Sequence, residues 1–336
     1  MSSTTPTKDD DDEKPNTNDE TDTQPSPAHA PQQEQQQQQQ QESTTATNKT
    51  FVYTGDPPKL SDLDRRIQHV TVDASLQKLP AQCFAKCFGL KHVNLSASKI
   101  KEMGEEAFFL CRSLQEIAIP ASLPHLPYQA MSGCGRLTEV SLQEGLQSIG
   151  RQAFQQCSKL KTIELPSTMV ELGNAAFKGC YDLEHVLFRK GSLLRAIPGH
   201  TFCMCHSLVE IELPASVEEL GDECFSNCVS LQAVKRASSE APVVVKVIGH
   251  GCFLQCMSLK ELFLTPQELE QVESIGEMAF EGCGQFQHSY KELPATRKMS
   301  EQSRESIRQS LMVVPTTTSR RVMDDEEEVL EEEEEE

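Results

Sequence analysis

The sequence predicts an α/β repeat solenoid, a coil of about nine to ten turns whose strands form a parallel concave β-sheet, with disordered tails at both ends. Three observations predict it. A phrase of the form AFxxC recurs through the middle of the chain, a strand phrase of the form LxxIxL follows each copy, and both ends of the chain lack apolar periodicity. Self-similarity at a fixed period of roughly 20–50 residues is the signature of repeat architectures.

Three aligned columns of residues define the repeat, and they advance in steps of 23 to 28 residues. The first column is the aromatic residue of AFxxC: Phe84, Phe108, Phe154, Phe177, Phe202, Phe225, Phe253 and Phe280, with Met131 in the same position. Three residues later comes a cysteine: Cys87, Cys111, Cys134, Cys157, Cys180, Cys205, Cys228, Cys256 and Cys283. Three residues further on comes the first apolar residue of the strand phrase, from Leu90 to Phe286.

One turn of this coil cannot fold alone. Each buried apolar side chain is worth roughly 1.5–3 kcal/mol, whereas ordering a residue costs on the order of 1–2 kcal/mol in backbone entropy. Stacked turns share their buried surface, and their strands pair in parallel about 4.8 Å apart. A period in this range with an LxxIxL core is typical of a leucine-rich repeat.

The phrase IGxxAFxxCxxLxxIxLPxSV resembles the BspA-type leucine-rich repeats, from about Ile67 to Tyr290. The resemblance implies a protein-interaction module without catalytic residues. Before the first AFxxC, the stretch IQHVTVDASLQKLPAQCF supplies a strand with Val70 and Val72, which we expect to be the amino-terminal cap. After Cys283, FQHSY breaks the strand phrase as a carboxy-terminal cap would.

The predicted domains are the solenoid over residues 51–290 and three flanking segments. Residues 1–50 are polar, acidic and glutamine-rich, so they bury too little apolar surface to offset ordering and are predicted to be disordered. Residues 291–321 are a linker or a helix that either docks on the solenoid end or binds a partner. Residues 322–336 form an acidic tail.

Acidity concentrates at the ends of the chain. The net charge is −20, and residues 1–50 and 291–336 carry −7 each. Such a balance disfavours nucleic acid and anionic membranes as partners, because both need clustered basic side chains. The amino terminus shows no secretory signal, and no stretch reaches the roughly 18 apolar residues of a membrane span. We expect an intracellular protein, cytoplasmic or nuclear, whose partner is a protein, in particular a basic one.

The cysteine column predicts a ladder of buried free thiols, since cysteine packs as a small hydrophobe whose S–H reaches a nearby carbonyl. Disulfides between adjacent turns are the alternative, against which the odd total of thirteen weighs. The stretch FCMCHSL, with Cys203, Cys205 and His206, has metal-binding residue types, but Cys205 belongs to the ladder. His69 beside His92 offers only two ligands. We therefore expect no metal and no cofactor.

The third and fifth residues of each strand phrase are predicted to face outward on the concave sheet, because strand side chains alternate. Six glutamates stand in these columns: Glu116, Glu139, Glu164, Glu210, Glu212 and Glu261. Leu187, Phe263 and Tyr290 add apolar contact area toward the carboxy-terminal half. These nine residues are the predicted protein-binding site, and the alternative is a face that is merely soluble.

No nucleophile–base arrangement, phosphate-binding glycine loop or metalloprotease motif occurs in the sequence. The leading hypothesis is a non-enzymatic scaffold that binds a partner protein through the concave sheet. The alternative is an acidic chaperone of histones or other basic proteins that acts through the carboxy-terminal tail. A leucine-rich solenoid followed by an acidic tail is similar to the acidic nuclear phosphoprotein family, although the repeat type differs.

Overall fold

The computed structural model describes residues 50–55, 67–237, 245–269, 271–284 and 286. The chain divides into two compact units, Met1–Thr47 and Asn48–Glu336, and all described residues belong to the second. The predicted tail of residues 1–50 lies outside the described residues except for Thr50, and the predicted segments 291–321 and 322–336 lie outside them, as does Tyr290.

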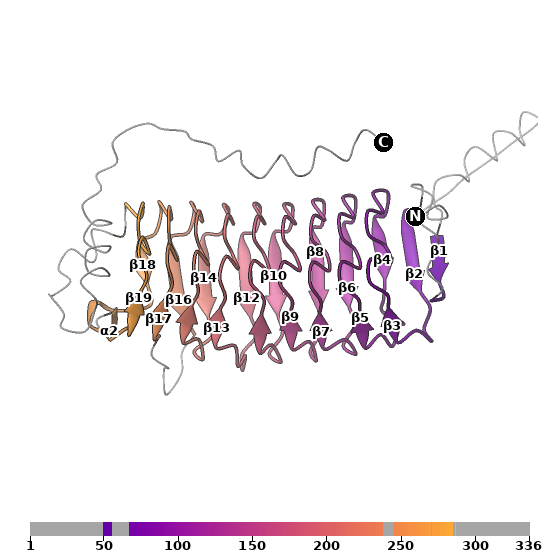
Figure 1. Cartoon of the computed structure of the whole chain (residues 1–336), viewed down its shortest axis with the longest axis horizontal. Helices are drawn as coiled ribbons and strands as arrows, with labels where there is room; N and C mark the ends of the chain where they lie inside the picture. Colours follow the sequence, from indigo (N-terminus) through magenta and orange to yellow (C-terminus); the bar gives the residue numbers. More distant parts are fainter. Residues whose placement is uncertain (1–49, 56–66, 238–244, 270, 285, 287–336) are drawn as a thin grey trace, which may run out of the picture. The chain divides into compact units, whose positions relative to one another are not determined.

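Ten strands, one per turn, build the face that we call the broad sheet, and they lie side by side in chain order (Figure 1). They are β1 (Thr50–Tyr53), β2 (His69–Val72), β4 (His92–Asn94), β6 (Glu116–Ile119), β8 (Glu139–Leu142), β10 (Thr162–Leu165), β12 (His185–Phe188), β14 (Glu210–Leu213), β16 (Ala233–Arg236) and β18 (Glu261–Leu262). Hydrogen-bonded ladders join β1-β2-β4-β6-β8, β10-β12 and β14-β16-β18, all parallel. The predicted parallel sheet is confirmed.

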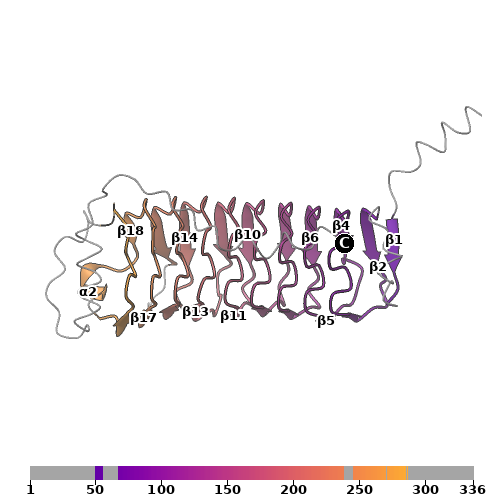
Figure 2. The same ribbon diagram turned by 45° about the horizontal axis from the view of Figure 1, so that its top comes forward.

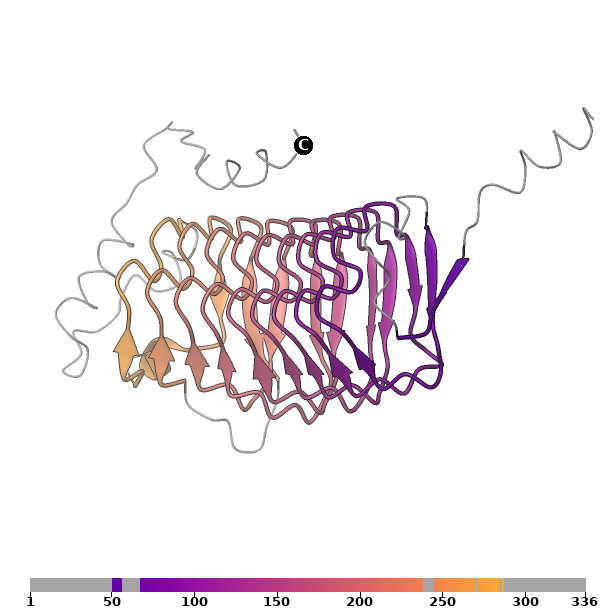
Figure 3. The ribbon, with the colours of Figure 1, turned by 45° about the vertical axis from the view of Figure 1, so that its right-hand side comes forward.

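A second row of two-residue strands, the narrow sheet, runs along another side of the coil (Figures 2 and 3). These strands are β3 (Lys78–Leu79), β5 (Glu102–Met103), β7 (His125–Leu126), β9 (Ser148–Ile149), β11 (Glu171–Leu172), β13 (Ala196–Ile197), β15 (Glu219–Leu220), β17 (Val247–Ile248) and β19 (Ser274–Ile275). They pair in parallel as β3-β5, β7-β9-β11 and β13-β15-β17-β19. The sequence pattern did not predict this sheet, because two residues are too few to show a period.

The α/β description is not confirmed, since the described residues hold one helix, the four-residue α2 (Pro266–Leu269). The segment that returns each turn to the broad sheet is a series of tight turns around the AFxxC phenylalanine. In the turn around Phe154, Gln152 and Gln156 both have φ of 57°. Most turns carry positive φ at the same two positions. A right-handed helix cannot pass through two left-handed residues, so the return segment forms turns instead.

The phenylalanine column forms the spine of the core, as predicted. Adjacent rings stack with centroids 5.3 Å apart between Phe154 and Phe177 and 5.6 Å apart between Phe177 and Phe202. At the amino-terminal end, the spine is closed by Tyr53 of β1, whose ring meets that of Phe84 edge-on at 5.2 Å. The predicted cap strand is β2, but the sheet begins one strand earlier than the sequence pattern indicated. At the other end, the Phe286 ring stacks on Phe280 at 5.0 Å.

Candidate protein-binding surface

Alternation along the broad strands separates core from surface as predicted. In β6, Glu116 and Ala118 are exposed while Ile117 and Ile119 are buried, and β10 and β14 repeat this pattern. Since neighbouring strands are in register, equivalent side chains form rows across the sheet. Glu116, for example, stands opposite Glu139.

Three of the six predicted glutamates are paired within the protein. Glu164 accepts hydrogen bonds from Arg189, with Nε at 2.8 Å, and Glu210 accepts one from the Lys235 ammonium at 2.6 Å. Both cations hold the pKa of their carboxyl partner below its usual value through these hydrogen bonds. Glu116 lies 2.8 Å from Nδ1 of His92. Glu164 and Glu210 therefore have less negative charge to offer a partner than the sequence pattern suggested, and one oxygen of Glu116 is already engaged by His92.

The other three, Glu139, Glu212 and Glu261, are exposed and make no ion pair with any described residue. Glu212 is aligned with Lys235 in the strand register, yet the lysine amine bonds to Glu210 instead. The nearby carboxylates of Glu261 and Glu212 add to the effect of Glu210 in raising the pKa of Lys235.

The predicted apolar residues differ in accessibility. Leu187 of β12 is 52% exposed, as a binding residue requires. Phe263 is half-buried, and the guanidinium of Arg236 covers its ring at 4.4 Å from the centroid. This cation–π contact occupies the face that Phe263 was predicted to offer. Tyr290 is not among the described residues.

A pocket of about 740 Å³ opens beside β12, and we call it the leucine pocket. It is lined by residues 186–193, which include Leu187, Arg189, Lys190 and Leu193, and by Glu212, residues 214–216 and Ala237. Leu193 is 66% exposed, so the pocket joins two exposed leucines to one unpaired carboxylate. Clustered exposed apolar side chains with a polar rim are typical of interaction sites.

Sequence reasoning missed Arg189, which lines this pocket, and its partner Glu144. Arg189 bridges Glu164 and Glu144, with Nη1 3.0 Å from the Glu144 carboxylate. The guanidinium, more than the hydrogen bonds from Ser167 and Thr168, lowers the pKa of Glu144 to about 2. One signal was available: Arg189 follows its strand phrase where Pro120, Pro166 and Pro214 follow theirs.

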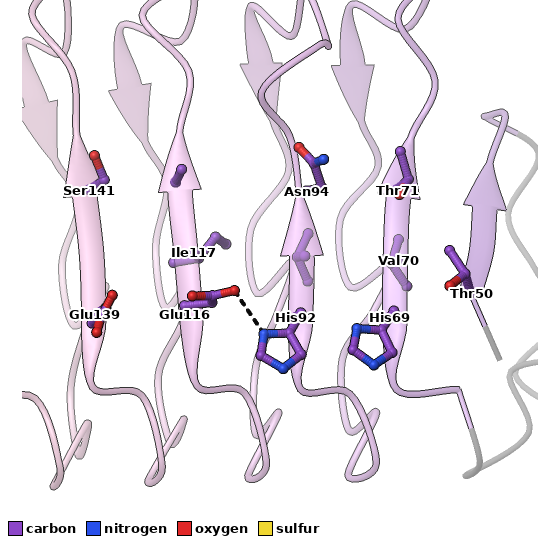
Figure 4. A pocket seen from close by; sticks show the side chains of 12 residues that line it. Thr50, His69, Val70, Thr71, His92, Asn94, Glu116, Ile117, Glu139 and Ser141 are labelled. Carbon is purple, nitrogen blue, oxygen red and sulfur yellow. Dashed lines mark hydrogen bonds and ion pairs between the residues drawn. The ribbon is translucent and has the colours of Figure 1, made fainter. Parts of the chain in front are cut away.

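A second pocket of about 560 Å³, the histidine pocket, lies over β2, β4, β6 and β8 (Figure 4). His69, His92, Glu116 and Glu139 form one row across it, and Thr71, Asn94 and Ser141 form another. The rings of His69 and His92 stack with centroids 4.8 Å apart. Val70, Val93, Ile117 and Ala118 also line this pocket, and no exposed leucine stands in it.

The class that this geometry defines is a parallel β-solenoid of leucine-rich repeats. The chain belongs to the family of the BspA type leucine rich repeat region, whose profile matches residues 64–184 and 188–291 in six copies. Members of this class are typically non-enzymatic scaffolds that bind other proteins. No curated protein sequence matches the chain.

Several solved structures share the repeat architecture. A leucine-rich repeat protein of T. pallidum is 23% identical, with 73% of this chain and 83% of that chain covered and a TM-score of 0.38. A leucine-rich cell surface protein of Faecalibacterium prausnitzii A2-165 is 21% identical, with 75% and 78% covered and a TM-score of 0.43. A leucine-rich repeat protein of Eubacterium ventriosum is 16% identical, with 69% of this chain and 89% of that chain covered and a TM-score of 0.44. Similarities of this size carry no functional argument. Separately, no helix within the described ranges is long and apolar enough to span a bilayer.

Proposed function

We propose that this protein is an intracellular, non-enzymatic scaffold that binds a partner protein on the broad sheet, centred on the leucine pocket. The observation that carries the proposal is the meeting of Leu187 and Leu193, both more than half exposed, with the unpaired Glu212 in one pocket. Interfaces obtain most of their affinity from a few apolar or aromatic anchors surrounded by polar groups. The carboxylate favours a partner segment with a basic side chain next to an apolar one.

An intracellular location of the protein agrees with the free state of its thiols. None of the thirteen cysteines is in a disulfide, and twelve of them are buried. Cys224 and Cys252, for example, share a hydrogen bond with the sulfurs 3.4 Å apart. Free thiols persist in reducing compartments.

Site-specific crosslinking tests where the partner binds. A photoreactive residue in place of Leu187 should capture a partner protein from cells, and the same residue at Val170 is the matched control. Val170 is 50% exposed but precedes β11 of the narrow sheet. Capture at position 187 and not at position 170 supports the proposal. Equal capture at both positions would contradict the proposal that the partner binds on the broad sheet.

The chaperone alternative depends on residues 322–336, which lie outside the described residues. Crosslinking to histones from within this segment, with none from position 187, would favour that alternative. Exposed charge contacts of a tail are screened within about 10 Å at 0.1 M salt, so such capture should also disappear as salt rises.

A further inference from the structure

Two consecutive turns bring three metal-ligand side chains together away from the broad sheet. His200 lies two residues before Phe202, and Cys203 lies directly after that phenylalanine. The amide of Cys203 donates to the carbonyl of His200 at 3.1 Å, so one tight turn carries both residues. Glu223 occupies, in the next turn, the position that His200 occupies in its own. The three candidate ligand atoms all lie within 4.8 Å of one another.

The spacing of His200 and Glu223 fits a tetrahedral ion. Nδ1 of His200 and a carboxylate oxygen of Glu223 are 3.5 Å apart. Zinc bonds to nitrogen and oxygen of about 2.0–2.2 Å, meeting at a tetrahedral angle, place two such ligands roughly 3.3 Å apart. Little movement is therefore needed to close the pair around one ion.

The imidazole also has an unsatisfied atom directed at this space. Nδ1 of His200 is shielded from solvent and makes no hydrogen bond, although the His200 ring as a whole is partly exposed. A buried polar atom without a partner is costly, so such atoms in native structures call for an explanation. A bound metal ion would satisfy Nδ1 of His200, so this atom is a second indication that the cluster is a ligand site.

Among the described turns, this combination of histidine, cysteine and glutamate occurs only in the two turns around Phe202 and Phe225. At the positions of His200 and Glu223 the other turns carry Gln82, Glu106, Gln129, Gln152, Ala175, Gly251 and Met278. At the position of Cys203 they carry Ala85, Phe109, Ser132, Gln155, Lys178, Ser226, Leu254 and Glu281. A fold requirement would recur in every turn. The three ligand types therefore do not follow from the repeat itself.

We propose that His200, Cys203 and Glu223 bind one zinc ion, with water as the fourth ligand. An imidazole, a thiolate and a carboxylate are the donors that Zn²⁺ accepts in three-ligand sites with an open position. Cys203 is 3% exposed, whereas His200 and Glu223 are partly exposed and open the cluster to solvent. Coordination replaces the thiol proton, which leaves to solvent as the Zn–S bond forms.

This set differs from the one that the sequence pattern suggested in FCMCHSL. Cys205 donates to the carbonyl of Phe177 at 3.4 Å and so belongs to the thiol ladder, as predicted. His206 packs against the ring of Tyr181, with centroids 5.1 Å apart. Only Cys203 of that stretch joins the proposed site. The other two ligands are His200, which lies upstream of the stretch, and Glu223, which lies in the next turn. No local sequence motif links these three residues.

Cobalt titration of the full-length, reduced protein tests the site. Co²⁺ replaces Zn²⁺ and gives a thiolate-to-metal absorption band in the near ultraviolet, which the carboxylates of the acidic tail cannot produce. We expect one equivalent of Co²⁺ to develop the band and one equivalent of Zn²⁺ to remove it. Absence of the band in the folded wild-type protein would overturn the proposal.

Variants assign the ligands without disturbing the fold, because each introduces a residue that other turns hold at the same position. These are His200→Gln, Cys203→Ser and Glu223→Gln. Cys203→Ser should abolish the band, and the other two should weaken binding at least about tenfold, since even outer-shell changes cost that much. Cys224→Ala removes another buried thiol, and His250→Gln another histidine, and both should bind as the wild type does. A band that survives Cys203→Ser or disappears in Cys224→Ala contradicts the assignment.

Discussion

The Sγ of Cys134 lies 3.2 Å from the carbonyl oxygen of Phe108, one turn earlier in the coil, and donates its proton to that oxygen. The same bond, at 3.0 to 3.4 Å, joins Cys111 to Phe84, Cys157 to Met131, Cys180 to Phe154, Cys205 to Phe177, Cys228 to Phe202, Cys256 to Phe225 and Cys283 to Phe253. The Phe108 carbonyl also accepts the amide of Cys111 in its own turn at 3.2 Å, so the repeated cysteine supplies a second donor that ties this carbonyl to the next turn. The predicted ladder of buried thiols is confirmed except at its first member, Cys87, which is half-buried.

The thiol ladder predicts loss of stability in alkali. Burial raises the pKa of both Cys134 and Cys180 to about 12, from about 9. Between pH 9 and 12 the unfolded chain loses thiol protons that the folded chain keeps, so stability should fall as pH rises through this window. Each thiol adds a slope of about 1.4 kcal/mol per pH unit. Urea unfolding from pH 8 to 10.5 measures it.

The control is the double variant Cys134→Ala/Cys180→Ala, in which two of these thiols are removed. It should be less stable than the wild type at pH 8 but lose stability less steeply as pH rises. Equal slopes for the two proteins would show that the ladder thiols are not protected by burial.

The phenylalanine spine predicts a large cost for truncation. Phe177 is fully buried between the rings of Phe154 and Phe202. Phe177→Ala should lower the free energy of unfolding by roughly 3–5 kcal/mol, since the stacked turns cannot collapse into the cavity. Phe88, which is 37% exposed, provides the control, and Phe88→Ala should cost far less. A loss below about 1 kcal/mol for Phe177→Ala in equilibrium unfolding would place the ring outside the core.

The glycine of the IGxxAFxxC phrase is required by the packing of one turn on the next. An added Cβ on Gly173 would lie 2.3 Å from the backbone nitrogen of Arg151 in the preceding turn, and its φ is not left-handed. The requirement is therefore close contact between successive turns. Gly173→Ala should destabilise the protein strongly, whereas Gly284→Ala, with nothing within 4 Å, should be nearly neutral. Comparable melting temperatures for the two variants would contradict this account.

The sequence predicted the columns that repeat in every turn and missed what varies between turns. The inward Ile117 and the outward Glu116 follow from alternation alone, and the phenylalanine spine follows from its period. The Arg189–Glu144 contact joins residues 45 positions apart through side-chain reach, which no local pattern encodes. The ion pairs of Glu164 with Arg189 and of Glu210 with Lys235 were missed for the same reason. A column of glutamates shows the negative charge but not the cations that bind to it.

Arg189 provides a direct test of those pairings. In Arg189→Ala the pKa of Glu144 should return from about 2 toward its ordinary value near 4.5, because the guanidinium is the main cause of the shift. The contribution of this carboxylate to stability is present above about pH 4.5 and lost as pH falls toward 2, and it is small because Glu144 is exposed. Titration of the Glu144 side-chain carbon by NMR measures the shift. Lys190→Ala is the neighbouring control and should leave that titration unchanged.

The pairing also decides which residues can test binding. Reversal of charge at Glu164 would place a lysine against Arg189 and disturb the sheet, so Glu164 is a poor probe of a partner. Leu187 and Glu212 are better, because both are exposed and neither holds another side chain in place. Exposed substitutions away from such contacts usually change stability by no more than about 0.5 kcal/mol.

The most direct measurement is the affinity of the crosslinked partner for three proteins: the wild type, Leu187→Glu/Glu212→Gln, and a chain that lacks residues 322–336. The double variant should bind more than about tenfold more weakly, equivalent to roughly 1.4 kcal/mol. Deletion of the tail should change the affinity less than about twofold, and moderate salt should have little effect on the wild type. Full binding by the double variant, with binding abolished by the deletion, would contradict a scaffold that works through its broad sheet.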